Sequence, residues 1–248
     1  DTAKPEATVH LTKFDTTHGK FNGDVYWDDG HLVVNGDRIF MCSERDPKKL
    51  PWKDLDIDIV LECTGAFRDQ EGAMQHIEAG ANKVLISAPG KDVDATVVYG
   101  VNQNVLKASD VVVSNASCTT NCLAPMAAAL HAYAPIQSGI MSTIHAYTGD
   151  QMILDGPQRK GDLRRSRAGA QNIVPNSTGA AKAIGLVIPE LNGKLIGSAQ
   201  RVPTPTGSTT ILTAVIKTDK EVTIDAINAA MKAEETESFG YNTDEIVS

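Results

Sequence analysis

Residues 114–122 contain the strongest chemical signal in the chain, the string Ser-Asn-Ala-Ser-Cys-Thr-Thr-Asn-Cys. A β-branched run precedes this string and an alanine-rich stretch follows it, which predicts a strand, a polar turn and then a helix. Cys118 then lies in the first helical turn, where unpaired backbone N–H groups and the helix dipole favour a thiolate. This position indicates a nucleophile, or else a structural cysteine in an unusual place.

The neighbours of Cys118 bear on that choice. Cysteine is often buried as a small apolar residue, but Ser117, Thr119 and Thr120 are polar and favour a site over a core. Cys122 follows one helical turn later, on the same face. A Cys-x-x-x-Cys spacing lacks the second ligand pair of a structural zinc site, so we expect no metal here and expect Cys122 to serve in packing.

Two further features could complete a site around this cysteine. His145 ends a β-like run, where a strand could deliver an imidazole as the base that an activated thiol needs; the alternative is an ordinary surface histidine. Arg201 and the string Asn-Ser-Thr-Gly at 176–179 offer a guanidinium, hydroxyls and amides that can hold phosphate. The alternative for them is a turn and a surface arginine.

Composition excludes several classes of function. The 248 residues are 42% hydrophobic and 22% charged, as in an ordinary globular protein, and the net charge of −8 gives no electrostatic basis for binding nucleic acid or an anionic membrane. No apolar run approaches the roughly 18 residues that span a bilayer, and no signal peptide is evident. Four cysteines are too few for a secreted disulfide scaffold. We therefore expect a cytoplasmic protein.

The first half of the chain changes its pattern near residue 57. Before it, short β runs at 25–27, 31–34 and 38–40 alternate with turns and predict hairpins. After it, buried strands alternate with a helix at 69–79 that ends at Gly80, which predicts a largely parallel sheet; the strands are expected at 57–63, 83–87, 95–99 and 110–113. Ligands bind at the carboxyl ends of such strands, where Thr64, Gly65 and Ser87 fall.

The second half predicts a different architecture. Long β-like runs at 138–145 and 209–216 suit an antiparallel sheet, with a polar, arginine-rich stretch at 158–167 between them and a helix at 225–235. We expect a two-domain α/β protein. Residues 1–117 form the parallel-sheet domain, and residues 118–248 form an α+β domain with a mainly antiparallel sheet.

The string at 114–125 resembles the active-site signature of phosphorylating glyceraldehyde-3-phosphate dehydrogenases. The likeness extends over essentially the whole chain, because the family's other motifs follow in the same order at 145–148, 155–157, 176–183 and 201–205. In detail the sequence is similar to a bacterial glycolytic form. The resemblance implies a Rossmann-type NAD-binding domain followed by a catalytic domain.

The resemblance also implies a mechanism. Cys118 attacks the aldehyde of glyceraldehyde 3-phosphate, and His145 takes the proton and stabilises the oxyanion together with the Cys118 backbone N–H. Hydride passes to NAD, and inorganic phosphate releases 1,3-bisphosphoglycerate from the thioester. Thr148 and Arg201 hold the substrate phosphate, and the attacking phosphate is held by Ser117, Thr119, Thr178 and Gly179. The stretch at 158–167 belongs to a loop that reaches a neighbouring subunit's cofactor in a homotetramer.

The cofactor side departs from the family pattern. Asp1 aligns with the acidic residue that binds the adenosine ribose and would repel the 2′-phosphate of NADP, while Thr64, Gly65 and Ser87 are the other expected cofactor contacts. The family's glycine-rich loop, within about the first 30 residues of the dinucleotide fold, is not in this sequence, nor is the family's final segment. We expect a polypeptide with these bounds to bind NAD poorly and to oxidise nothing.

Other functions are compatible with the same motifs. Erythrose-4-phosphate dehydrogenases share the cysteine motif and oxidise an aldehyde without a strong requirement for phosphate as the acceptor. A catalytically inactive fragment or a surface binding protein is the remaining alternative. The family also often carries Asn where this sequence has Gly149.

Overall fold

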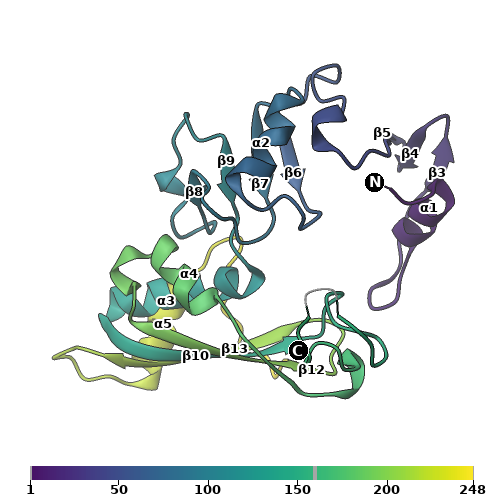
Figure 1. The fold of residues 1–248 in the computed structure, drawn as a ribbon. Helices are drawn as coiled ribbons and strands as arrows, with labels where there is room; N and C mark the ends of the chain where they lie inside the picture. The colour runs from purple at the N-terminus through teal and green to yellow at the C-terminus, as the bar shows by residue number, and fades with distance from the viewer. Residues whose placement is uncertain (1, 159–160, 248) are drawn as a thin grey trace. The chain divides into compact units, whose positions relative to one another are not determined.

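The computed structural model describes residues 2–158 and 161–247. The chain forms two compact units, one of Asp1–Val60 with Met74–Lys83 and the other of Leu61–Ala73 with Val84–Ser248. Figure 1 shows the order of the helices and strands along the chain. The predicted domain boundary after residue 117 stays a prediction.

The first unit contains short antiparallel sheets and a helix. Helix α1 (Pro5–Lys13), which we did not predict, begins with a proline at its first position, and it is followed by the strand pair β1 (Phe14–Asp15) and β2 (Gly19–Lys20). The three-stranded meander predicted from the sequence is confirmed; it consists of β3 (Val25–Asp28), β4 (His31–Val34) and β5 (Asp37–Phe40). Its turns, Asp29-Gly30 and Asn35-Gly36, have positive φ at both residues, as two-residue hairpin turns require.

The predicted parallel strands are confirmed, although they are shorter than expected. They lie in the order β6 (Ile59–Glu62), β7 (Lys83–Ile86), β9 (Val112–Ser114) and β8 (Ala95–Thr96). Strand β8 ends early because the Val98 N–H donates to the Asn102 side chain at 2.8 Å. Helix α2 (Gln70–Glu78) precedes Gly80, whose φ of +109° confirms the predicted glycine stop.

A mixed sheet dominates the second unit. Strand β10 (Ile136–Ala146) pairs antiparallel with β13 (Ser208–Ile216), as predicted, and parallel with β12 (Leu195–Val202). The short strand β11 (Val174–Asn176) pairs antiparallel with the far side of β12. We did not predict β12, because its Gly, Ser, Ala and Gln residues have little β propensity. The predicted class, an α/β chain with a parallel and a mainly antiparallel sheet, is confirmed.

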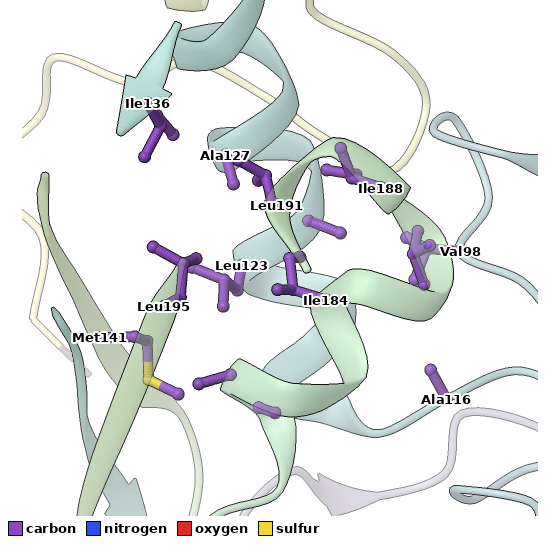
Figure 2. Packing of buried hydrophobic residues seen from close by; sticks show 14 residues of the cluster. Val98, Ala116, Leu123, Ala127, Ile136, Met141, Ile184, Ile188, Leu191 and Leu195 are labelled. Atoms are coloured by element: carbon purple, nitrogen blue, oxygen red, sulfur yellow. The ribbon is translucent and has the colours of Figure 1, made fainter. Parts of the chain in front are cut away.

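Helices cover one face of this mixed sheet (Figure 1). They are α3 (Cys118–Tyr133), α4 (Ala180–Val187) and α5 (Ile224–Ala233), of which α3 contacts both other helices and the strands β10 and β13. The fully buried core residues Leu123 of α3, Met141 of β10 and Ile184 of α4 meet in one cluster (Figure 2). Four single 3₁₀ turns complete the described elements; they are Pro47–Lys49, Gln103–Val105, Gly169–Gln171 and Pro189–Leu191. Within the described residues, no helix has the length and hydropathy to cross a membrane.

The core cluster makes a stability prediction. Ile184→Ala is expected to lower the free energy of unfolding by about 2–5 kcal/mol, because it removes buried methyl groups and leaves a cavity. Leu186→Ala on the same helix is the matched control; its side chain is 64% exposed, so the loss should be about 0.5 kcal/mol or less. Denaturant titration monitored by circular dichroism measures both values. Equal losses in the two variants would contradict the packing described here.

Candidate active site

The turn between β9 and α3 places Cys118 as the sequence predicted. Ser114 ends β9 and is fully buried, and Ala116 in the turn has a left-handed backbone with φ of +55°. Ser117 caps the helix, since its Oγ accepts a hydrogen bond from the Thr120 N–H at 3.0 Å. Cys118 is the first residue of α3, and it is exposed.

His145 lies beside this cysteine. Its Nε2 is 3.4 Å from the Cys118 Sγ, while its Nδ1 is 2.7 Å from the Ala146 carbonyl oxygen. A carbonyl only accepts, so Nδ1 carries the proton in this arrangement and a neutral ring presents an unprotonated Nε2 to the sulfur. The imidazole is only 9% exposed, which shields it from water. The pair can therefore exchange a proton directly.

Arg201 is positioned by the parallel pairing of β10 and β12, in which it stands opposite His145. One guanidinium nitrogen, Nη1, donates to the Thr148 Oγ1 at 2.5 Å and to the Ala146 carbonyl at 3.2 Å. The same carbonyl thus accepts hydrogen bonds from Arg201 and His145. The structure brings together Cys118, His145, Thr148 and Arg201, which come from three separate segments of the sequence.

A second arginine extends this group. Arg165 forms an ion pair with Asp150, and it donates to the Asn176 Oδ1 from Nε at 3.0 Å and from Nη2 at 2.8 Å. The Thr148 hydroxyl donates to the other oxygen of Asp150, which connects both arginines through hydrogen bonds. We did not single out Asp150 or Arg165 from the sequence. The available signals were the position of Asp150 two residues after Thr148 and the arginine-rich stretch at 158–167.

Electrostatics at the two arginines favour an anion. Burial lowers the pKa of the Arg165 guanidinium, and the neighbouring charge of Arg201 lowers this pKa further. Burial also lowers the pKa of Arg201, whereas the nearby Cys118 raises it. Among the described residues, the buried Nε of Arg201 has no hydrogen-bond partner. The two guanidinium groups are partly desolvated and repel each other. A phosphate-like anion beside them would stabilise both charges.

The remaining predicted phosphate contacts lie at two helix starts. Thr119 is buried, with its Oγ1 4.0 Å from the Cys118 Sγ. The Thr178 hydroxyl accepts a hydrogen bond from the Ala180 N–H at 3.2 Å, and Gly179 is the N-cap residue of α4. Helix α4 packs against α3 and β12. A side chain at Gly197 of β12 would come within 3.0 Å of the Thr178 methyl group, so this glycine leaves room for Thr178.

The predicted cofactor residues lie at the carboxyl ends of β6 and β7. The buried Glu62 carboxylate accepts from the Thr64 N–H at 2.7 Å and from its hydroxyl at 2.5 Å, and the Glu62 carbonyl accepts from the Ser87 N–H at 3.1 Å. Gly65 has φ of +72°, with open space where a Cβ would be. Hydroxyls, backbone amides and an unobstructed glycine at this edge fit a dinucleotide. Asp1 lies outside the described residues.

The other cysteine of α3 differs from our expectation. Cys122 is exposed, so the prediction that it serves in packing is wrong for this chain. The pattern favoured packing because the neighbouring residues Leu123 and Ala124 are apolar, and these do enter the core. Across the part of the chain that the structure describes, no cluster of three or more His, Cys, Asp or Glu side chains is arranged to hold a metal ion.

The site has three features: a cysteine beside a buried imidazole, two neighbouring arginines that favour an anion, and a parallel sheet whose carboxyl edge fits a dinucleotide. Together they are typical of a nucleotide-dependent enzyme with a thiol nucleophile. Comparison with known proteins gives the family. Residues 117–248 match the model described as "Glyceraldehyde 3-phosphate dehydrogenase, C-terminal domain", and residues 1–70 match "Glyceraldehyde 3-phosphate dehydrogenase, NAD binding domain". The chain belongs to the glyceraldehyde-3-phosphate dehydrogenase family.

Similar proteins agree with this assignment. Glyceraldehyde-3-phosphate dehydrogenase of Streptococcus pyogenes serotype M1 is 59% identical over 249 residues, and the enzymes of Clostridium pasteurianum and Clostridium acetobutylicum are 56% identical over 248. Each alignment covers 100% of this chain and 74% of the relative. The family, the α/β class with a Rossmann-type part, the NAD-dependent dehydrogenase class and the cofactor NAD are confirmed as predicted.

The cysteine–histidine contact predicts how fast the thiol reacts. Iodoacetamide alkylates thiolates, so His145→Ala is expected to slow the alkylation of Cys118 by about tenfold or more, since the proton acceptor is lost. Cys122, exposed on the same helix, is an internal control whose rate should not change. Mass spectrometry of peptides sampled over time measures both rates. An unchanged rate at Cys118 would show that His145 does not activate it.

Proposed function

We propose that the protein oxidises glyceraldehyde 3-phosphate to 1,3-bisphosphoglycerate in glycolysis, with NAD as the oxidant and inorganic phosphate as the second substrate. The observation that carries this proposal is the 3.4 Å contact between the Cys118 Sγ and the His145 Nε2, beside the hydrogen bond of Arg201 to Thr148. This arrangement supports a thiol nucleophile next to an anion site. The names of the similar proteins support the choice of substrate.

His145 and Cys118 begin the reaction. Nε2 takes the thiol proton, and the thiolate attacks the aldehyde carbon to form a C–S bond and an oxyanion. The protonated ring and the Cys118 backbone N–H then donate to this oxyanion. The ring passes its proton to the oxyanion to give a hydroxyl, and as the carbon then loses its hydride, His145 takes this proton back and a thioester on Cys118 remains. Thr64, Gly65 and Ser87 would hold NAD, which would supply the hydride acceptor.

Phosphate completes the cycle. An oxygen of inorganic phosphate attacks the thioester carbonyl, the C–S bond breaks, and Cys118 leaves as a thiolate that is ready for another turnover. We assign this phosphate to the donors at the starts of α3 and α4, namely Ser117, Thr119, Thr178 and Gly179. Their support is position, since Thr119 is 4.0 Å from the sulfur and α4 packs against α3.

Arg201 and Thr148 are assigned to the phosphate that the aldehyde substrate carries. The guanidinium is partly buried and its neighbour Arg165 is also cationic, so a dianion would relieve their mutual repulsion. The Thr148 hydroxyl already accepts from Arg201, so both groups lie side by side as possible donors to one anion. The attraction between the arginines and the bound dianion would offset the free energy of desolvating these charges.

We further propose a cytoplasmic homotetramer. The face of the mixed sheet that points away from α3 and α4 carries exposed apolar side chains among polar ones; the apolar side chains are Ile140 at 49%, Ile196 at 65%, Ile211 at 49% and Val215 at 61% exposed. They lie on three adjacent strands, with Ile140 paired to Ile196. Such a patch on regular structure suits contact with further copies of the chain. Cys63, Cys118 and Cys122 carry free thiols, which suits a reducing compartment.

Replacing the nucleophile tests the mechanism. In a full-length protein that also carries the family's glycine-rich loop and final segment, Cys118→Ser is expected to lower kcat by about a thousandfold or more, because serine is not ionised beside His145, while the affinity for NAD stays the same. Cys122→Ser, one helical turn further along, is the matched control and should keep its turnover. Absorbance at the NADH band measures kcat, and calorimetry measures NAD binding. A Cys118→Ser variant that remains active contradicts this mechanism, and so does a parent protein without turnover.

The acceptor and the substrate are tested together. Initial rates with glyceraldehyde 3-phosphate should rise at least about tenfold when phosphate is added, because thioester cleavage by water lacks the bound nucleophile. Erythrose 4-phosphate should be oxidised more slowly under the same conditions. If erythrose 4-phosphate is instead the faster substrate and phosphate has no effect, the protein is an erythrose-4-phosphate dehydrogenase.

A further inference from the structure

We infer that Asn121 is a positioning residue that fixes the direction of the Cys118 backbone N–H. This inference rests on the proposed function and deepens it. The Asn121 side chain lies one turn into α3 and donates from Nδ2 to two backbone carbonyls, that of Asn115 at 2.8 Å and that of Ser117 at 2.9 Å. One amide group therefore ties the first turn of α3 to the end of the preceding loop.

The second of these bonds acts on the reacting centre through a single peptide unit. The Ser117 carbonyl and the Cys118 N–H belong to the same planar group, and the described chain contains no cis peptide bond. In a planar trans peptide the C=O and N–H point in opposite directions. A hydrogen bond that holds the Ser117 oxygen thus sets where the Cys118 N–H points. That N–H has no acceptor within the helix, so it can donate to an oxyanion.

The loop needs such a restraint. Ala116 carries a Cβ yet has φ of +55°, a conformation that persists only where the surroundings enforce it. The two carbonyls that Asn121 binds lie on either side of Ala116. From the other direction, the buried Ser114 hydroxyl accepts from the Ala116 N–H at 3.1 Å and donates to the Ala88 carbonyl at 2.8 Å. Asn121 and Ser114 together hold this turn in place.

The helix ladder is interrupted one turn after the Ser117 carbonyl, but not at that carbonyl. Pro125 lies inside α3, four residues after Asn121, and has no N–H to donate to the Asn121 carbonyl. The backbone bond from the Asn121 N–H to the Ser117 carbonyl, 2.9 Å, remains. The side-chain bond therefore gives the Ser117 oxygen a second donor from Asn121, and two donors restrain its direction more than one does.

The experiment compares Asn121→Leu, which keeps a similar shape without a donor, with Asn121→Ala in the full protein. Removal of an oxyanion donor lowers kcat strongly, so misdirection of this donor should lower kcat about 10- to 100-fold. KM for glyceraldehyde 3-phosphate should stay within about twofold, because ground-state binding does not use this N–H. Alkylation of Cys118 by iodoacetamide forms no oxyanion, so its rate should stay within about threefold.

Asn172→Ala is the matched control. It removes an equivalent bond, from the Asn172 Nδ2 to the Ala168 carbonyl at 2.8 Å, and should leave kcat unchanged. An unchanged kcat in both Asn121 variants overturns the inference. A parallel fall in kcat and in the alkylation rate, or a failure of both variants to fold, also overturns it by showing a purely structural role. Turnover in Cys118→Ser would refute the proposed function itself, whatever the Asn121 variants show.

Discussion

The contact between Cys118 and His145 joins the first residue of helix α3 to the second-last residue of strand β10. This contact requires one particular position of the helix along the strand. The apolar cluster that includes Leu123, Met141 and Ile184 fixes the position of the helix on the sheet. Because protein interiors are packed as densely as crystals, any shift of the helix that moved the Cys118 sulfur would also open voids in this cluster. The chemistry of the site thus depends on packing that lies beneath it.

The local features of the fold could be predicted because neighbouring residues determine them. The serine before Cys118 caps a helix, and the Gly80 stop and the hairpin turns follow from backbone preference. Strand β12 was missed because its place is fixed by β10, more than fifty residues earlier in the chain, as their register shows. The interactions of Arg165 with Asp150 and Asn176 were missed for the same reason. Burial of Thr119, or exposure of Cys122, likewise depends on tertiary contacts.

Family membership and atomic structure answer different questions about this chain. The matched models give the enzyme class and the cofactor, but they do not say which groups restrain the reacting atoms. The structure adds a continuous set of hydrogen bonds in which the Ala146 carbonyl serves both the imidazole and the guanidinium. The imidazole that faces the thiol and the guanidinium of Arg201 are therefore both restrained by one backbone group.

The parallel pairing of β10 with β12 has a consequence for folding. Two parallel neighbours cannot be joined by a tight turn, and here the connection also has to pass through β11 and α4 before β12 enters the sheet. Closing so long a loop costs entropy before any contact forms, and sheets built from distant segments assemble slowly. The capped turn around Cys118 can form early, because its bonds are local. The arginine pair needs β12, which carries Arg201, so we expect the site to be completed only after this long connection has closed.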